Sequence, residues 1–385
     1  MRFSSDRGAR ASRQVFDNLE VNRHAMNPIA LVMIVRNEAR CLARCLDSVR
    51  AHVDEMLVVD TGSTDDTVAI AEHRGAHVAR FDWIDDFAAA RNAALGRVDT
   101  PWRLVLDADE WLTSGASALT ELRHMAPEFI GSVQVESLVR DEHGAQQCAP
   151  SWLPRILPRG VRYVGRIHEQ PDAALPRQRL ALQVAHDGYL PDLSAAKRGR
   201  NRKLLQAALA DDPTDAYLHY QLGKDHEVHG EHEIAVGCYE CASRLLSCGP
   251  GAAVAWRHDL VLRRAYTLKK CRRFDEALAL IRRELVAWPD SPDLPFTLGD
   301  VLLDAALAQP ARAGEWLPQI EQAWLRAIAI GERPDLPDSL RGRGSFLAAQ
   351  NLAAFHGSLG QAEQARQWRE RAAQWRAESD APGAR

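Results

Sequence analysis

The chain has 385 residues, a formal net charge of −4, 46% hydrophobic residues and 26% charged residues. This length allows two domains with buried cores, and the nearly balanced charge argues against wholesale nucleic-acid binding. No run approaches the roughly 18 apolar residues that cross a bilayer. Its 7 cysteines are irregularly spaced and predict ordinary thiols in a reducing cytosol, so we expect a cytoplasmic protein.

Three segments with different composition follow one another. Residues 1–27 are basic and polar without an apolar run, which predicts a poorly ordered tail and not a signal peptide. Residues 28–192 alternate apolar runs with helical patterns. Residues 193–385 are rich in Ala, Leu, Arg and Glu and carry only helical patterns. We therefore predict an α/β domain followed by an all-α repeat domain.

The α/β segment opens on IALVMIV (29–35), a continuous β-branched run that is typical of a buried parallel strand. The pattern then predicts, in order, a helix at 38–52, a strand at 55–60, a helix at 63–76, a strand at 76–81, a helix at 85–98 and a strand at 102–110. This alternation predicts a mainly parallel, Rossmann-like sheet with right-handed crossovers. Ligands bind such sheets beyond the carboxyl ends of the strands, where Arg36, Glu38, Asp60 and Asp107 fall.

The run VVDTGSTDDT (58–67) ends the second predicted strand. Asp60 is expected to point into the crevice, where an acidic group suits a base edge or a ribose and would repel phosphate. Ser63 or Thr64 can cap the next helix, with Asp65 and Asp66 in its first turn, where the helix dipole favours acid. The alternative is that the whole run only caps a helix.

A second acidic motif, LDADE (106–110), ends the last predicted strand of this series. Asp107 and Asp109 lie two residues apart, so their side chains point the same way along a strand. Where the strand breaks, the two carboxylates can converge on Mg²⁺ or Mn²⁺, which prefer oxygen ligands and often complete their shell with phosphate.

The second half contains a helical repeat. Four segments, at 230–242, 272–284, 318–330 and 360–372, align with one alanine in a common phase, and each follows another amphipathic stretch. The phased residues are Ala235, Ala277, Ala323 and Ala365, at intervals of 42, 46 and 42 residues. These intervals exceed the roughly 34 residues of a tetratricopeptide repeat, but they predict similar stacked helix pairs. The small side chain lets two helices approach closely.

The motifs together resemble the family 2 glycosyltransferases, which have the GT-A fold. The matching segments are 35–49, VVDTGSTDDT, FAAARNAAL (87–95) and LDADE. RILPRGVRYVGRIHEQ (155–170) and VAHDGYL (184–190) are similar to the short bacterial members with C-terminal tetratricopeptide repeats. That subgroup includes lipooligosaccharide β-glucosyltransferase-like enzymes and the peptide S-glycosyltransferases of glycocin biosynthesis.

The resemblance implies an inverting transfer of a hexose from a nucleoside diphosphate sugar, most often a UDP-sugar, with Mn²⁺ or Mg²⁺. Glu38 and Asp60 would contact the nucleoside, with Arg36 and Ser63 in the same donor site. Arg91 would approach the diphosphate or ribose. Asp107 would face the ribose and the metal. Asp109 would be the main metal ligand, and His186 is the candidate third ligand.

An inverting transfer also needs a base that accepts the acceptor's proton. GRIHEQ follows a predicted strand at 161–165 and offers two candidates. We favour Glu169 as the base with His168 positioning the substrate, although a histidine can itself take the proton at neutral pH. A buried strand-end histidine beside a solvated glutamate is the structural alternative.

Two rival functions remain at this point. A nucleotidyltransferase also uses a parallel sheet and paired carboxylates, but it usually has a glycine-rich first loop, and VRNEARC (35–41) has no glycine. A scaffold with a decayed catalytic half is the other rival, and the intact acidic motifs and Arg91 argue against it.

The predicted partners are the donor and an acceptor that is either a peptide or protein, or a saccharide. The repeats can select that acceptor or form a homodimer. KRGRNRK (197–203) can contact anionic lipid at the inner membrane face or be a solvated helix face, so membrane contact is at most peripheral.

Overall fold

The structure, a computed structural model, describes residues 26–140, 146–187, 191–248, 254, 256–334, 336 and 339–380. Residues 1–25 of the predicted basic tail, and the side chains of Cys148 and Cys248, lie outside these described parts. Contacts divide the chain into two compact units. The first contains the described residues up to Glu136 together with Trp152–Val164 and Glu169–Asp187. The second contains the described residues of Ser137–Ser151 together with Gly165–His168 and the helices after Gly188.

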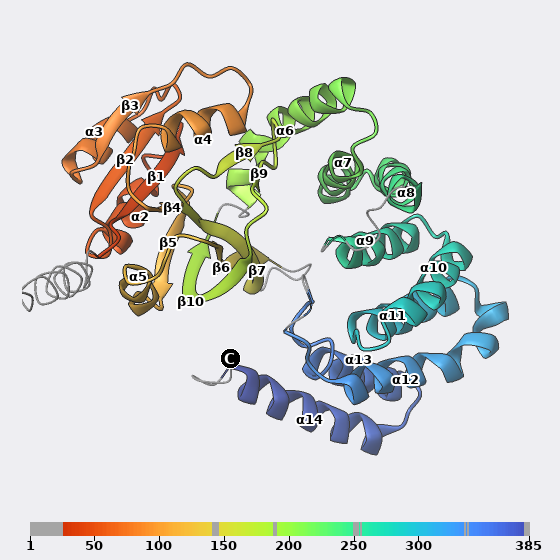
Figure 1. Cartoon of the computed structure of the whole chain (residues 1–385). Helices are drawn as coiled ribbons and strands as arrows, with labels where there is room; N and C mark the ends of the chain where they lie inside the picture. Colours follow the sequence, from red (N-terminus) through yellow and green to blue (C-terminus); the bar gives the residue numbers. More distant parts are fainter. Residues whose placement is uncertain are drawn as a thin grey trace, which may run out of the picture. The chain divides into compact units, whose positions relative to one another are not determined.

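The first unit is built on one large sheet. Its elements are β1 (Ile29–Val35), α2 (Leu42–Val49), β2 (Glu55–Asp60), α3 (Thr67–His73), β3 (His77–Arg80), α4 (Phe87–Leu95), β4 (Trp102–Val105), β5 (Glu110–Ser114), α5 (Ser117–Leu122), β6 (Ile130–Arg140), β7 (Gln146–Pro158), β8 (Arg162–Val164), β9 (Gln170–Asp172) and β10 (Arg177–His186). Figure 1 shows this order in colour from red to green.

The sheet has 8 strands in the order β3-β2-β1-β4-β7-β6-β10-β5. The first four are parallel, which confirms the predicted α/β fold class. Beyond β4 the sheet is extended by antiparallel pairs, β4 with β7 and β10 with β5. In the parallel register Val35 lies opposite Asp60 and Val32 opposite Val105, so the loops that follow β1, β2 and β4 leave the same edge.

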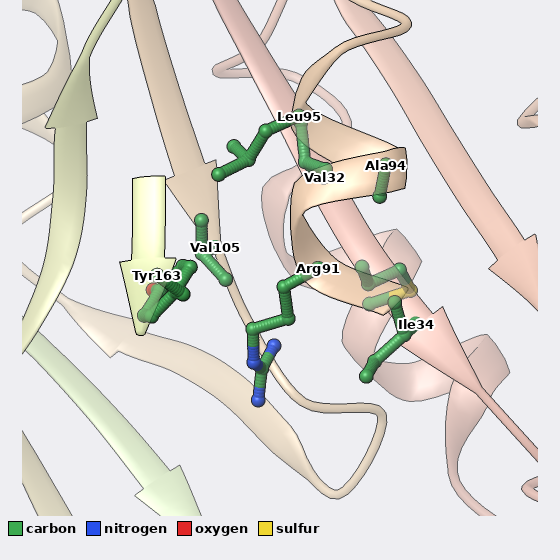
Figure 2. A pocket seen from close by; sticks show the side chains of 8 residues that line it. Val32, Ile34, Arg91, Ala94, Leu95, Val105 and Tyr163 are labelled. Atoms are coloured by element: carbon green, nitrogen blue, oxygen red, sulfur yellow. The ribbon is translucent and has the colours of Figure 1, made fainter. Parts of the chain in front are cut away.

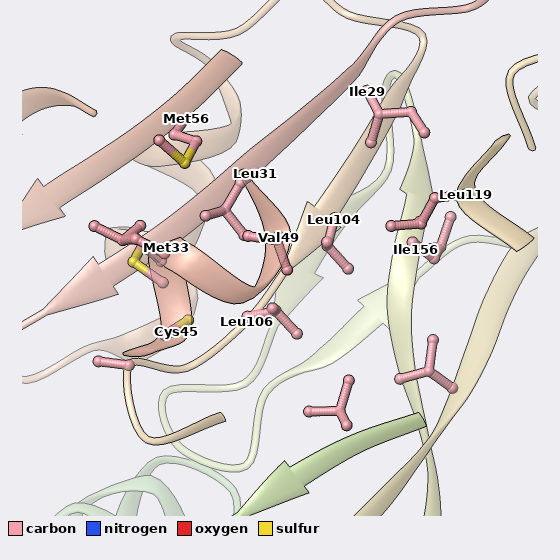
Figure 3. Close-up of a cluster of buried hydrophobic side chains, with 14 of the residues drawn as sticks. Ile29, Leu31, Met33, Cys45, Val49, Met56, Leu104, Leu106, Leu119 and Ile156 are labelled. Atoms are coloured by element: carbon pink, nitrogen blue, oxygen red, sulfur yellow. The ribbon is translucent and has the colours of Figure 1, made fainter. Parts of the chain in front are cut away.

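The two faces of β1 bury alternate residues, as a central strand of a covered sheet requires. Its odd-numbered residues join a core with α2, α5 and part of α3, which Figure 3 shows around Leu31, Met33 and Val49. Its even-numbered residues, Ala30 and Val32, pack on the other side against α4. The central strand β1 is therefore covered on both faces.

The second unit consists of paired helices. They are α6 (Pro191–Asp211), α7 (Ala216–Val228), α8 (His232–Cys248), α9 (Arg257–Lys270), α10 (Phe274–Ala287), α11 (Asp293–Ala308), a short 3-10 turn η1 (Pro310–Arg312), α12 (Ala313–Ile330), α13 (Phe346–Ser358) and α14 (Ala362–Asp380). The four phased alanines lie on α8, α10, α12 and α14, and each is at most 5% exposed. This confirms that they are packing positions.

Equivalent turns join three of the pairs. Gly230, Arg272 and Gly360 have positive φ, and the next residue's amide hydrogen-bonds back across the turn in each case, for example Glu231 N–H to the His226 carbonyl at 2.9 Å. This is the left-handed termination that commonly ends helices. A close approach also requires glycine at Gly223, because a Cβ there would lie 2.4 Å from the Tyr239 ring. The tetratricopeptide-like repeat therefore has a local steric basis.

Candidate active site

The loops after β1 and β2 are joined by hydrogen bonds. The Asn37 amide donates to Ser63 Oγ (2.9 Å), and Asn37 Oδ1 accepts from the Thr64 amide (2.7 Å). The Glu38 amide donates to Thr67 Oγ1 (2.8 Å). Two of the predicted donor-site residues, Glu38 and Ser63, are thereby held in neighbouring loops, and Arg36 lies exposed beside them.

Asp60 is buried at the end of β2, and its carboxylate shapes the turn that follows. It accepts hydrogen bonds from the amides of Gly62 and Ser63, each at 3.1 Å. Gly62 has a φ of 108°, a conformation that L side chains rarely adopt. The turn therefore orders the acidic group at the sheet edge and keeps the loop close to it.

The helix after this turn begins later than expected. The sequence predicted a start at Ser63 or Thr64, but α3 begins at Thr67 and neither residue caps it. Asp65 instead accepts hydrogen bonds from the Ala39 and Thr67 amides, each at 3.1 Å. These side-chain contacts hold residues 63–66 in a turn, which is the competition that Ser, Thr and Asp offer to a first helical turn.

The DxD motif also lies in a turn. The sequence predicted one strand from 102 to 110, but β4 ends at Val105 and Glu110 opens β5. The Glu110 amide donates to the Asp107 carbonyl (3.0 Å), and Glu110 Oε2 accepts from the Asp107 amide (3.0 Å). This reciprocal pair fixes Asp107 and Asp109 on a tight reversal at the carboxyl edge of the sheet.

Two arginines neutralise Asp107. Arg91 Nη2 donates to Asp107 Oδ1 (2.7 Å), and Arg155 Nη2 donates to Oδ2 (3.0 Å). Arg155 also pairs with Glu110 at 2.5 Å, and Arg91 Nε donates to Glu169 Oε1. Burial alone would raise the pKa of the Asp107 carboxyl, but Arg91 and Arg155 outweigh it and hold that pKa well below its usual range. The structure thus brings the predicted residues Arg91, Asp107 and Glu169 into one network.

The surroundings of this network are apolar. Figure 2 shows Arg91 leaving α4 near Tyr163, and Val32 and Val105 line the same small pocket. Burial raises the pKa of Tyr163 to about 12, and it also raises the pKa of Glu110, with the charge of Asp107 acting in the same direction. Arg91 Nη1 and Arg155 Nε are buried without a hydrogen-bond partner among the described residues. The network therefore keeps donors that a ligand can use.

Asp109 and His186 form a separate pair. His186 Nε2 lies 3.5 Å from Asp109 Oδ2, and both side chains are largely buried. Burial would lower the pKa of His186, but its hydrogen bond to Asp109 outweighs burial and raises it. Among the described residues no three His, Cys, Asp or Glu side chains converge as a preformed metal site.

The charge balance nevertheless fits a divalent cation. Asp107, Asp109, Glu110 and Glu169 face Arg91 and Arg155, which leaves a formal excess of two negative charges with a neutral histidine. Carboxylate oxygens with one imidazole nitrogen are a ligand set that Mn²⁺ accepts. Asp109 and His186 are the residues that would hold it, because both Asp107 oxygens already accept from arginine.

The two candidates for the base lie in different units. Glu169 belongs to the first unit and contacts Arg91, whereas His168 is assigned to the second. His168 has a φ of 53°, and burial together with the charge of Lys224 lowers its pKa to about 4. Its imidazole is therefore neutral at neutral pH.

Several residues of this region have no assigned role in the sequence interpretation, namely Glu110, Arg155, Tyr163 and Asp187. Arg155 and Tyr163 lie within the 155–170 motif, and Glu110 follows the DxD directly. Membership of these motifs was the only sequence feature that could have indicated these three residues. Asp187 pairs with Arg40 (3.0 Å) and Arg44 (2.6 Å). Arg44 in turn stacks on Trp111, 3.5 Å from the ring centre, and so covers one face of that indole.

A parallel sheet with acidic groups and spare arginine donors at its carboxyl edge is the arrangement of an α/β domain that binds a charged ligand at that edge. The family model Glycosyl transferase family 2 matches residues 30–128, which include β1 to α5 and both acidic motifs. The chain therefore contains a family 2 glycosyltransferase domain, and tetratricopeptide-like helical repeats follow it.

Curated relatives share parts of the chain. A TPR repeat-containing protein of Synechococcus elongatus is 41% identical over 217 residues, covering 52% of this chain and 52% of that protein. The glycosyltransferase SunS of Bacillus subtilis is 26% identical over 212 residues, covering 53% of this chain and 50% of SunS. The chain thus spans about half the length of these relatives. The crystal structure of MamA is 14% identical, with a TM-score of 0.36 over 48% of this chain and 92% of that chain.

The structure also bears on membrane contact. Within the described parts of the chain, no helix is long and apolar enough to cross a bilayer. In the basic run at 197–203, Arg202 pairs with Asp225 (2.7 Å) and Glu231 (2.9 Å), so its charge is neutralised within the second unit. The side chains of residues 197 and 198 lie outside the described part.

Proposed function

We propose that this protein is a metal-dependent inverting glycosyltransferase that moves a hexose from a nucleoside diphosphate sugar to a peptide, protein or saccharide. UDP is the nucleotide that we propose first. The observation that carries the proposal is the Arg91–Asp107–Arg155 network beside the Asp109–His186 pair, in a domain of glycosyltransferase family 2. Spare guanidinium donors and an excess of carboxylates occur together there.

The donor's two charged parts suit different members of this site. The diphosphate is anionic, and the free Nη1 of Arg91 is a buried donor that can approach it or the ribose. A divalent cation held by Asp109 and His186 would supply positive charge where the leaving diphosphate becomes more negative. Asp107, Glu38, Asp60, Ser63 and Arg36 are proposed to complete the ribose and nucleoside contacts.

Glu169 remains our proposed base. A base must lie where it can accept the acceptor's proton, and the hydrogen bond from Arg91 Nε fixes the position of the Glu169 carboxylate in the network. His168, neutral at neutral pH, is the alternative proton acceptor. Exchanging Glu169→Gln keeps the hydrogen bond from Arg91, so a loss of turnover with unchanged donor binding would support this role.

The repeat unit is the basis of our proposal for the acceptor. Concave faces of stacked helix pairs commonly bind extended peptides, which favours a peptide or protein acceptor, and dimerisation through the repeats is the other proposal. We propose that the reaction takes place in the cytoplasm, with at most peripheral contact at the inner membrane face.

The first test avoids the unidentified acceptor. The full chain is titrated with UDP by calorimetry, with and without Mn²⁺, and the titration is repeated with Asp109→Ala and with the control Asp99→Ala. Asp99 is a suitable control because it is an aspartate of the same unit whose side chain is 92% exposed. We expect binding that Mn²⁺ strengthens, with at least tenfold weaker affinity in Asp109→Ala and no change in the control.

Other outcomes separate the rival functions. Binding of GDP or dTDP in place of UDP would change the nucleotide and keep the enzyme class. If no nucleoside diphosphate binds in either metal condition, the donor site is not functional and the scaffold hypothesis replaces the enzyme. If UDP does bind, a screen of UDP-sugars for release of the free hexose would identify the transferred sugar.

A further inference from the structure

The repeat unit contains a cavity of about 380 Å³ that is separate from the sheet edge. Three consecutive helices form it, α8, α9 and α10, which follow one another in the cyan and green part of Figure 1. Its lining residues are Glu240, Ser243, Arg244, Ser247, Arg257, Arg264, Arg283 and Glu284. This volume lies at the small end of the range for ligand pockets, about 300–1,000 Å³.

The lining is strongly polar and has too few carboxylates for its arginines. Buried Glu284 accepts from both Arg257 (2.9 Å) and Arg283 (3.1 Å). One oxygen of Glu240 is the partner of Arg264, at the long distance of 3.3 Å. Four arginines against two glutamates leave a formal excess of two positive charges inside the cavity.

Two guanidinium groups have donors to spare. Arg264 Nε is buried without a hydrogen-bond partner among the residues that the structure describes. Arg244 Nη2 contacts Cys241 Sγ at 3.3 Å, and a thiol sulfur is only a weak acceptor. An unsatisfied buried N–H costs free energy, so Arg264 Nε favours an acceptor in the cavity, and the exposed Arg244 guanidinium can donate to the same acceptor.

The serine hydroxyls do not supply further donors. Ser243 Oγ donates to the Tyr239 carbonyl (2.8 Å) and Ser247 Oγ to the Ser243 carbonyl (2.9 Å). Their hydrogen atoms are thus used within α8. The donors facing the cavity are arginine N–H groups, whose planar fork matches the oxygens of carboxylate and phosphate.

We propose that this cavity binds a phosphate group. A phosphate monoester carries close to two negative charges at neutral pH and so balances the excess, whereas one carboxylate would balance only half of it. The size leaves room for a small moiety attached to the phosphate. The site goes beyond the proposed glycosyl transfer and does not depend on it, because its residues all belong to the second unit.

The test is a calorimetric titration of the full chain with inorganic phosphate. Arg244→Ala and Arg283→Ala remove exposed arginines that line the cavity, and neither change leaves a buried carboxylate unpaired. Arg282→Ala is the matched control, since Arg282 lies on the same helix, is exposed and pairs with Gln319 outside the cavity. We expect about tenfold weaker phosphate binding in each of the first two variants and unchanged binding in the control.

The same titration in an Asp109→Ala background separates this site from the donor site, because phosphate binding should persist there while UDP binding is at least tenfold weaker. Glycerol phosphate and vesicles of phosphatidic acid in phosphatidylcholine distinguish a soluble phosphate ester from a lipid headgroup, each with Arg244→Ala as the control. The assignment is wrong if phosphate does not bind, if Arg282→Ala weakens it equally, or if a glutamate-rich peptide binds with the same arginine dependence and phosphate does not.

Discussion

Arginines that pair with carboxylates are used differently in the two units. In the second unit Arg263 donates to Asp259 (2.6 Å) and Glu227 (2.7 Å), and the hydroxyls of Tyr220 and Tyr239 donate to the same two carboxylates. In the first unit Arg91 and Arg155 share Asp107, and each keeps a buried nitrogen without a partner among the described residues. We call the Arg263 group the closed set, because its charges and hydroxyls pair with one another and stabilise the fold. We call the Arg91 and Arg155 group the open set, because its unpaired nitrogens can bind a ligand.

The pKa values follow the same division. Burial alone would raise the pKa of Asp259, but Arg263 outweighs burial and lowers it. The pKa of Asp107 is likewise lowered, by Arg91 and Arg155. Glu110 shares Arg155 with Asp107, but its pKa is raised, because burial and the charge of Asp107 outweigh Arg155. The guanidinium that buried Glu110 shares with half-buried Asp107 therefore does not offset the burial of Glu110, and this favours additional positive charge at the sheet edge.

The largest expected effect comes from opening the closed set. Arg263→Met leaves the largely buried carboxylates of Asp259 and Glu227 without their guanidinium partner, and we expect the free energy of unfolding to fall by about 4 kcal/mol. Arg366→Met is the control, because Arg366 pairs with Glu363 and Glu370 on an exposed helix face, and its loss should leave the free energy of unfolding almost unchanged. Urea unfolding followed by circular dichroism measures both, and equal losses would contradict the distinction.

A smaller effect is expected in the open set. Arg155→Met removes one of the two cations of Asp107 and the partner of Glu110, which should cost about 3 kcal/mol and weaken UDP binding. Adding Glu110→Gln should restore about 1–2 kcal/mol, since the unpaired buried charge is gone. Arg159→Met is the matched control, because Arg159 pairs with exposed Asp99. A double variant that is less stable than Arg155→Met would show that Arg155 does not act through Glu110.

Much of this architecture could be predicted from local sequence. β1 and β2 have the predicted bounds because continuous β-branched runs specify buried parallel strands, and the phased alanines are buried because a helix period repeats them on one face. The start of α3 was missed since Asp65 competes for the backbone amides of the turn. Element ends depend on such side-chain contacts, which propensity does not encode.

The candidate site was predictable in its acidic members and not in its pairing. Asp107 and Asp109 were found from spacing after an apolar strand. Arg155 reaches Asp107 from β7, 48 residues later, by way of the antiparallel pair of β4 and β7. That pairing is a long-range property of the sheet, so the sequence could indicate the segment 155–170 and not the partner of Asp107.

The smallest of the three effects concerns a carboxylate with neutral hydrogen-bond donors. Asp300 on α11 accepts from Trp324 Nε1 (3.2 Å) and Asn351 Nδ2 (2.9 Å), and burial raises its pKa from 3.8 to about 6, with Lys269 and Arg343 opposing in part. The folded state therefore holds this proton more tightly than the unfolded state. The resulting stabilisation is complete below about pH 4 and is lost as the pH rises through about 6.

Asp300→Asn should remove that loss, because the amide oxygen keeps both hydrogen bonds without a charge to desolvate. We expect the variant to be about 2 kcal/mol more stable than the native chain near pH 7 and equally stable near pH 4. Asp304→Asn is the control, since Asp304 pairs with Lys269 and its side chain is 45% exposed. Urea unfolding at both pH values measures the difference. If the stability of the native chain does not fall relative to Asp300→Asn as the pH rises from about 4 to 6, the prediction is wrong. Lys269 and Arg343 would then offset the burial of the Asp300 carboxylate completely.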